Sequence, residues 1–122
     1  MKALISETQI QQAAFEEIRF RRKESPLWDC IFSIPNQGVG RNKRLQLEGA
    51  KAGVWDILIA VPRGMVPMCW IEVKTKTGYL SEAQVEFGNL MRSQGCLMYV
   101  CRSTEEIIKV CKNYLFPKEL GS

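Results

Sequence analysis

Three residues in the middle of the chain have the types and spacing of a hydrolytic metal site. Asp56 is followed by 15 residues, then by Glu72 and, two positions further on, by Lys74. Alternate side chains of a β-strand project from the same face, so Glu72 and Lys74 are expected to lie side by side. Two carboxylates held close together repel each other and lose hydration, and a divalent cation relieves both costs. The spacing therefore predicts a cation site beside an ammonium group.

These side chains also match what phosphodiester hydrolysis requires. The reaction needs a nucleophilic water and a Lewis acid on a phosphate oxygen, and a carboxylate-held Mg²⁺ supplies both. An ammonium group stabilises the negative charge that develops on the phosphate. Oxygen donors without histidine favour a hard metal, Mg²⁺ or Mn²⁺. Taken singly, the residues have ordinary explanations as well, since a strand Asp is often satisfied at an edge and E-x-K is often a surface ion pair.

The segments around these residues predict a β-hairpin. Residues 54–61 are β-branched and almost entirely apolar, which is typical of a central strand buried on both faces. Residues 68–74 form a second strand, and the short loop at 62–67 favours antiparallel pairing. Such a hairpin brings Asp56 and Glu72 together.

The remaining segments complete an α/β pattern. Ser81 and Gln84 have capping-box spacing at the start of a helix. Residues 35–44 are expected to be a turn followed by a basic loop. The other predicted elements are a helix over 6–23, a strand over 30–34, a helix over 81–94, a strand over 97–101 and a helix over 103–115. The order α-β-β-β-α-β-α predicts a mixed sheet flanked by helices.

Composition narrows the class of protein. The 122 residues carry 17 Lys and Arg against 13 Asp and Glu, and they include five cysteines and no histidine. One domain over residues 1–122 is expected at this length. Without an imidazole, Ser-His-Asp, Cys-His and His-ligated zinc sites are excluded within one chain. An odd cysteine count excludes complete disulfide pairing, and scattered free cysteines behave as small buried hydrophobes. No signal peptide or membrane span is visible, so we expect a cytoplasmic protein.

Three ordered motifs resemble a known family. They are G-V-W-D-I-L-I at 53–59, W-I-E-V-K at 70–74 and L-S-E-A-Q at 80–84. Together they resemble the VRR-NUC (virus-type replication-repair nuclease) domain of the PD-(D/E)xK nuclease superfamily, as do S-E-T-Q-I-Q at 6–11 and I-P-N-Q-G at 34–38. The resemblance implies a restriction-endonuclease-like core. Trp55 departs from the family, whose members commonly have Pro or another small residue before the Asp.

The resemblance also implies roles for individual residues. Asp56 and Glu72 would be metal ligands, together with the backbone carbonyl of Val73. Lys74 would position or activate the attacking water and stabilise charge in the transition state. Gln84 would orient part of the site from the following helix.

A further acid is expected on the first helix. At about 100° per residue, Glu7 and Gln11 fall on the apolar side of that helix, Glu17 lies near it and Glu16 points away. The family places its acid near the helix start, so Glu7 would be a further metal or water contact. Glu17 is the alternative.

Basic residues indicate binding of a polyanion. Residues 19–63 contain nine Lys and Arg but four Asp and Glu. Such clusters neutralise phosphates without reading sequence, although a basic helix end also has a favourable dipole interaction. The candidate DNA-binding residues are Arg19, Arg21, Arg22, Lys23, Arg41, Lys43, Arg44 and Lys76.

These observations predict an Mg²⁺- or Mn²⁺-dependent DNA endonuclease. Stand-alone family members resemble Holliday-junction resolvases, which implies a homodimer acting on branched DNA, and the family name suggests a virus- or phage-encoded protein. No membrane or nucleotide cofactor is expected. The alternatives are a non-catalytic DNA-binding module and a nuclease acting on linear or flap DNA without junction preference.

Overall fold

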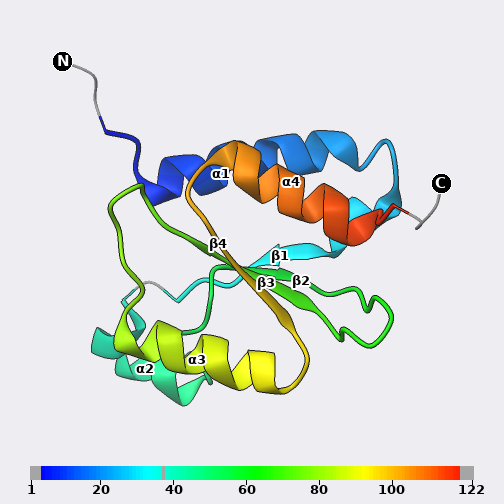
Figure 1. Ribbon diagram of the computed structural model, residues 1–122. Helices are drawn as coiled ribbons and strands as arrows, with labels where there is room; N and C mark the ends of the chain where they lie inside the picture. The colour runs from blue at the N-terminus through cyan, green and yellow to red at the C-terminus, as the bar shows by residue number, and fades with distance from the viewer. Residues whose placement is uncertain (1–3, 37, 119–122) are drawn as a thin grey trace.

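A four-stranded mixed sheet forms the centre of the protein, in a computed structural model that describes residues 4–36 and 38–118 (Figure 1). Its strands, in their order across the sheet, are β1 (Ile31–Ser33), β2 (Ile57–Ile59), β3 (Cys69–Val73) and β4 (Leu97–Cys101). β2 runs antiparallel to both β1 and β3, whereas β3 and β4 are parallel. The predicted α/β fold and its antiparallel hairpin are confirmed.

Helices cover both faces of this sheet (Figure 1). On one face lie α1 (Glu7–Arg21) and α4 (Thr104–Leu115), which contact each other. On the other lie α3 (Glu82–Ser93) and the short α2 (Lys43–Leu47). Two 3₁₀ turns, η1 (Pro26–Cys30) and η2 (Val39–Arg41), belong to the connections on either side of β1. The sheet is therefore the middle of three layers.

The side chains of β3 alternate between the two faces of the sheet and so belong to two separate parts of the hydrophobic core. Ile71 and Val73 pack into the cluster beneath α1 and α4, whereas Trp70 joins Trp55 in the cluster beneath α3. Because strand side chains alternate, Glu72 projects to the α3 side like Trp70. A carboxylate thus occupies a position on a strand whose residues are all buried.

Three predicted strands and the first helix are shorter than expected: β3 lacks one residue at each end of the predicted range 68–74, and β1 and β2 are also shortened. Regular pairing covers three residues each in β1 and β2, although single backbone hydrogen bonds continue beyond them, as from Ile34 N–H to the Asp56 carbonyl. α1 ends at Arg21 rather than residue 23. Pro26 disfavours helical geometry at the residue before it, and Ser25 is accordingly extended, so the chain leaves the helix earlier.

The loop predicted for residues 41–44 is wrong in part, because η2 ends in it and α2 begins in it. The Asn42 side chain accepts a hydrogen bond from the Leu45 N–H at 3.1 Å and caps α2. A helix of five residues is too short to show a hydrophobic period, so only its cap was visible in the sequence. Gln37, part of the quoted I-P-N-Q-G motif, lies outside the described residues.

The cysteines are unpaired, and most of them belong to the interior. All five cysteines are free, and Cys69, Cys96, Cys101 and Cys111 are buried, as predicted for structural thiols. Burial raises the pKa of the Cys69 thiol to about 12, so it stays protonated and unreactive at neutral pH.

Within residues 4–36 and 38–118, no helix has the length and apolar character needed to cross a membrane.

Close contacts dock α3 onto the segment before β2. The Trp55 indole N–H donates to the Gln84 carbonyl at 2.9 Å. A Cβ at Gly88 would lie 2.8 Å from the Trp55 ring, and one at Gly53 would lie 2.8 Å from Ala83 backbone atoms. Gly53 also has φ +90°, a conformation that other residues rarely adopt. These contacts hold the start of α3 against residues 53–55, which directly precede Asp56.

We predict that Gly88→Ala destabilises the protein. Overpacking against the buried Trp55 ring costs about 1–3 kcal/mol, which outweighs a gain of about 1 kcal/mol in helix propensity. Urea denaturation should therefore show a net loss of up to about 2 kcal/mol in the free energy of unfolding. Gly40→Ala is the matched control, because Gly40 faces open space without positive φ. A Gly88→Ala protein as stable as the wild type would contradict the clash.

Candidate functional site

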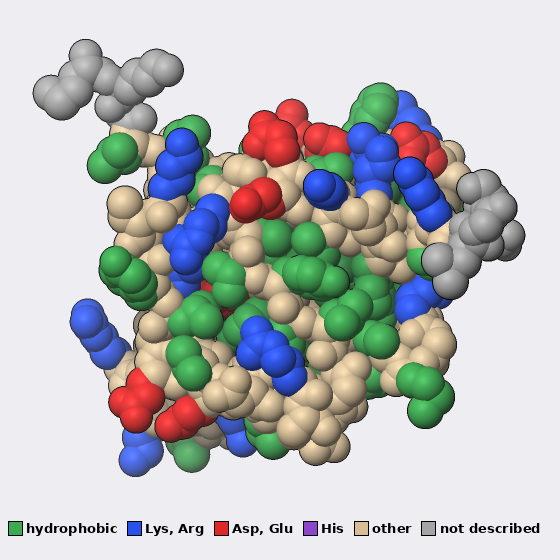
Figure 2. Space-filling model, in the orientation of Figure 1, with side chains coloured by type: hydrophobic (Ala, Val, Ile, Leu, Met, Phe, Trp, Pro, Cys, Tyr) green, Lys and Arg blue, Asp and Glu red, His purple; other side chains and the backbone are tan. Residues whose placement is uncertain are grey.

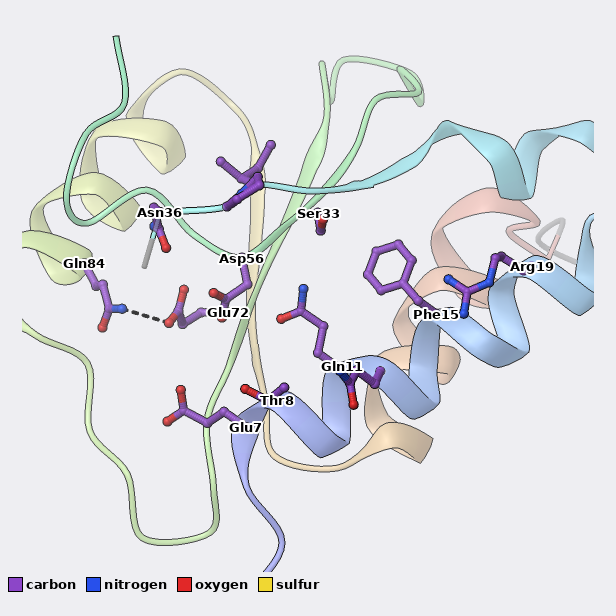
Figure 3. Close-up of a pocket in the computed structure, with 13 residues that line it drawn as sticks. Glu7, Thr8, Gln11, Phe15, Arg19, Ser33, Asn36, Asp56, Glu72 and Gln84 are labelled. Atoms are coloured by element: carbon purple, nitrogen blue, oxygen red, sulfur yellow. Dashed lines mark hydrogen bonds between the residues drawn. The ribbon is translucent and has the colours of Figure 1, made fainter. Parts of the chain in front are cut away.

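The β2–β3 register brings the two predicted carboxylates together. Ile57 pairs with Ile71 and Leu58 with Trp70, so extending the ladder places Asp56 opposite Glu72. Both side chains reach one cleft of about 570 Å³ between α1, the segment after β1 and the start of α3 (Figure 3). The two groups are close enough that, in addition to burial, the charge of Asp56 raises the pKa of Glu72.

Asp56 is tied to the end of β3. Its Oδ2 accepts a hydrogen bond from the Val73 N–H at 2.8 Å. In a strand, the N–H and C=O of one residue point to the same side, so the Val73 carbonyl is directed toward Asp56 too. Burial raises the pKa of Asp56, and the Val73 N–H opposes that rise. The two oxygen donors predicted beside Glu72 therefore lie at one strand end.

Glu72 is almost completely buried, with 1% of its surface exposed. One oxygen, Oε2, accepts from the Gln84 side-chain amide at 2.8 Å and lies 3.5 Å from Lys74 Nζ. The other, Oε1, is buried without a hydrogen-bond partner. Burial, and secondly the charge of Asp56, raises the pKa of Glu72 to about 8, while Lys74 opposes the shift. An unpartnered buried carboxylate oxygen is a feature that a bound cation would satisfy.

The helix cap of α3 aims Gln84 at this carboxylate. The Ser81 side chain accepts from the Gln84 N–H at 3.2 Å, and the Gln84 side-chain oxygen accepts from the Ser81 N–H at 2.8 Å. The predicted capping box is confirmed. Because the box uses the amide oxygen, the NH₂ group is left to donate to Glu72. The cap thus fixes the orientation of a side chain in the cleft.

Lys74 lies next to Glu72, as the i, i+2 spacing predicted. Its backbone N–H donates to the Cys101 carbonyl at 3.0 Å, which continues the pairing of β3 with β4. The side chain is 11% exposed, so the ammonium group is mostly withdrawn from bulk water. Its Nζ lies 3.5 Å from Glu72 Oε2, which places a positive charge beside the carboxylate pair, although Lys74 is not among the residues that line the cleft.

The acid predicted on the first helix reaches the same cleft from the opposite wall. Glu7 is the exposed first residue of α1 and lines the cleft with Asp56 and Glu72 (Figure 3). In the part of the chain that the structure describes, however, no three His, Cys, Asp or Glu side chains are grouped closely enough to hold a metal. A direct metal contact by Glu7 therefore stays a prediction. The alternative acid, Glu17, bonds to Arg21 at 2.7 Å.

The run of basic residues at positions 19 and 21–23 does not form a single continuous basic surface, because most of its members have partners within the chain. Arg19 lines the cleft. The other members interact within the chain: Arg21 with Glu17 at 2.7 Å and Glu24 at 3.4 Å, Arg22 with Asp29 at 3.5 Å, and Lys23 with the Phe20 ring at 4.6 Å. Of this run, only Arg19 shares a cleft with the carboxylates among the described residues.

The other basic candidates lie on exposed connections. Arg41 and Lys43 are exposed at η2 and α2, while Arg44 pairs with Glu48 at 3.1 Å. Lys76 is exposed in the loop between β3 and α3. On the face shown in Figure 2, Lys and Arg side chains are scattered among acidic and hydrophobic ones. Whether these residues contact DNA remains a prediction.

Sequence reasoning missed a residue that shapes the loop after Lys74. The Arg102 guanidinium donates to the carbonyls of Thr75 and Gly78 at 2.6 and 2.8 Å. This residue directly follows β4, so the parallel pairing with β3 brings it beside that loop. An isolated arginine carries no local signal for such a contact. Arg102 therefore organises the segment that carries Lys76.

The fold is similar to that of a solved structure described as a VRR_NUC domain protein. The two chains superpose with a TM-score of 0.76 and 23% sequence identity, over 93% of this chain and 90% of that one. The VRR-NUC fold predicted from the three motifs is thus confirmed. A scan against protein-family models found no match, and a search of curated proteins found none either. At this level of identity, the similarity is one of fold.

We predict that Glu72 makes the stability of the metal-free protein fall as pH rises. Its folded pKa, about 8, lies above the ordinary value of 4.5. The contribution of the protonated form is therefore complete below about pH 4.5 and is lost as pH rises through about 8. In EDTA, Glu72→Gln should be more stable than the wild type by about 2–4 kcal/mol at pH 9, with a much smaller difference at pH 5.

Urea denaturation at the two pH values measures this effect. Glu86→Gln, an exposed change on α3, is the control and should shift both measurements equally. A difference between wild type and Glu72→Gln that does not change with pH would show that the Glu72 carboxyl group has an ordinary pKa.

Proposed function

We propose that this protein is a metal-dependent DNA endonuclease. The observation that carries the proposal is the half-buried Asp56 paired with the buried Glu72, which keeps one carboxylate oxygen unpartnered, beside the buried Lys74. Such an arrangement raises the free energy of the protein alone and becomes favourable with a bound cation. The similarity of fold to a VRR_NUC domain protein supports the same activity.

The donor atoms fit Mg²⁺ or Mn²⁺. Carboxylate oxygens of Asp56 and Glu72 and the carbonyl of Val73 form an all-oxygen set, which hard cations prefer. Glu7 would contribute from the facing wall, either to the cation or to its water. When bound, the cation supplies Lewis-acid polarisation of the phosphate and a water of lowered pKa.

The side chains of the chain itself then have separate tasks. Lys74 places its ammonium group beside the carboxylate pair, where it stabilises negative charge on the phosphate and orients the attacking water. Gln84 holds Glu72 through its amide and leaves the unpartnered Oε1 free. The low exposure of Glu72 and Lys74 strengthens these electrostatic interactions, because little water surrounds them.

We extend the proposal to the substrate and the assembly. Each chain has one cleft with this carboxylate pair, so a symmetric cut in two strands of a branched DNA needs two chains. A homodimer acting on branched DNA, such as a four-way junction, follows from this requirement and from the resemblance in the motifs. Exposed Arg41, Lys43 and Lys76 supply sequence-independent contacts to phosphates.

We predict that nicking of a labelled four-way junction requires Mg²⁺ or Mn²⁺ and is abolished by EDTA. Asp56→Asn, Glu72→Gln and Lys74→Met should each lower the rate at least about 100-fold, because each removes a ligand or a charge needed in the transition state. Binding of the junction should persist. Lys112→Ala, an exposed change on α4, is the control. Binding without cleavage by the wild type would identify a DNA-binding module, and full activity of Lys74→Met would overturn the assigned role.

We further predict faster cleavage of the junction than of a linear duplex with the same arm sequence. Sedimentation of the free protein should give the mass of a dimer. Equal rates on both substrates would remove the junction preference while leaving the nuclease, and a monomer with symmetric paired cuts would remove the need for a dimer.

A further inference from the structure

One wall of the cleft carries side chains that the metal site does not use. Gln11, Phe15 and Arg19 follow Glu7 at intervals of four residues along α1 and line the cleft (Figure 3). Residues four apart share one face of a helix, so these side chains form a row leading away from Asp56. The row begins with an amide, continues with an aromatic ring and ends with a cation.

The facing wall, formed by residues 33–36, is uncharged. It consists of Ser33 at the end of β1 and of the segment that follows, including Asn36. The Asn36 amide NH₂ donates to the Val54 carbonyl, which fixes the side chain and leaves its oxygen as an acceptor. Acidic groups lie at one end of the cleft and Arg19 at the other, with amides, hydroxyls and a ring between them.

We propose that the middle of this cleft binds one unpaired nucleotide of the DNA strand being cut. The base would stack on Phe15, its edge would hydrogen-bond to the amides of Gln11 and Asn36, and Arg19 would contact an adjoining phosphate. Aromatic rings and amides suit a neutral base with exposed donors and acceptors, whereas a guanidinium group suits a phosphate. This proposal rests on the proposed nuclease function and defines the substrate as DNA with an unpaired nucleotide at the cut.

The spacing along α1 supports an unstacked strand. Four helical residues advance about 6 Å, so successive members of the row are about 6 Å apart along the helix axis. Nucleotides of a strand in B-form DNA advance only about 3.4 Å each. The row therefore matches an extended strand better than a strand within a duplex.

The size of the cleft supports a single nucleotide. Its volume of about 570 Å³ is that of a pocket for a small molecule and not of a groove for a double helix. A paired base has its faces and its Watson–Crick edge covered, so it cannot use the ring and the amides together. Phe15 also packs partly against the core beneath α1, which holds the ring in place and leaves part of it in the cleft.

The proposal can be tested by equilibrium binding in EDTA, where cleavage is absent. The probes are a duplex with a short unpaired tail containing 2-aminopurine and the same duplex fully paired. We expect wild-type protein to bind the tailed duplex about tenfold more tightly than the paired one and to quench its fluorescence by stacking. Phe15→Leu should lose about tenfold in affinity for the tailed duplex and lose the quenching, with paired-duplex binding unchanged.

Matched variants separate stacking from a general effect on folding. Phe15→Tyr keeps a ring and should retain both affinity and quenching. Phe32→Leu is the control, because Phe32 is an exposed phenylalanine on β1 that does not line the cleft. Thermal unfolding of each variant establishes that it is folded before binding is measured.

Equal affinity for the two probes, or quenching that survives Phe15→Leu, would overturn the nucleotide site. Cleavage that persists in either case leaves the nuclease proposal intact. Preferential, Phe15-dependent binding of the tailed duplex by a protein that never cleaves would instead support the nucleotide site and remove the nuclease.

Discussion

Two carboxylates that face each other inside a protein repel, and burial deprives both of the water that would screen them. The pairing of β2 with β3 imposes this arrangement on Asp56 and Glu72, because the register that buries Ile57 and Ile71 also places the two acids opposite each other. The surrounding structure therefore has to hold a pair of groups that would otherwise separate, and several of its features are understood as doing so.

The most important of these features is the start of α3. Gln84 bonds simultaneously to the Ser81 backbone and to Glu72, and the Trp55 indole bonds to the carbonyl of the same residue. The absence of a side chain at Gly88 allows the indole to approach the helix. Trp55 departs from the small residue expected at its position. In this protein the larger side chain fastens the helix that orients Gln84.

The chemistry of the site was predictable from sequence to a larger extent than its surroundings. Asp56, Glu72 and Lys74 stand out because charged residues interrupt apolar strands, and Gln84 stands out through its cap. The extent of β2 was not predictable, since the flanking residues are apolar whether or not they pair regularly. The contacts of Arg102 and the cleft row of α1 depend on tertiary placement. The interval of four from Glu7 through Arg19 was present in the sequence, but only the structure shows that this face of α1 borders a cleft.

α1 lines the cleft along its length, from Glu7 near the carboxylate pair to Arg19 at the other end. Ile10, Ala14 and Ile18 are buried against the sheet, and the Thr104 hydroxyl donates to the Ile10 carbonyl at 2.9 Å, which ties α1 to α4. With this neighbouring stripe of residues fixed, the helix carries the Gln11–Arg19 row as a rigid unit. The distance between the carboxylate pair on the sheet and a base stacked on Phe15 is then set by the packing of α1 against the sheet, and not by a flexible loop. A nuclease built in this way would cut at a constant distance from the unpaired nucleotide, whatever the sequence of the DNA around it.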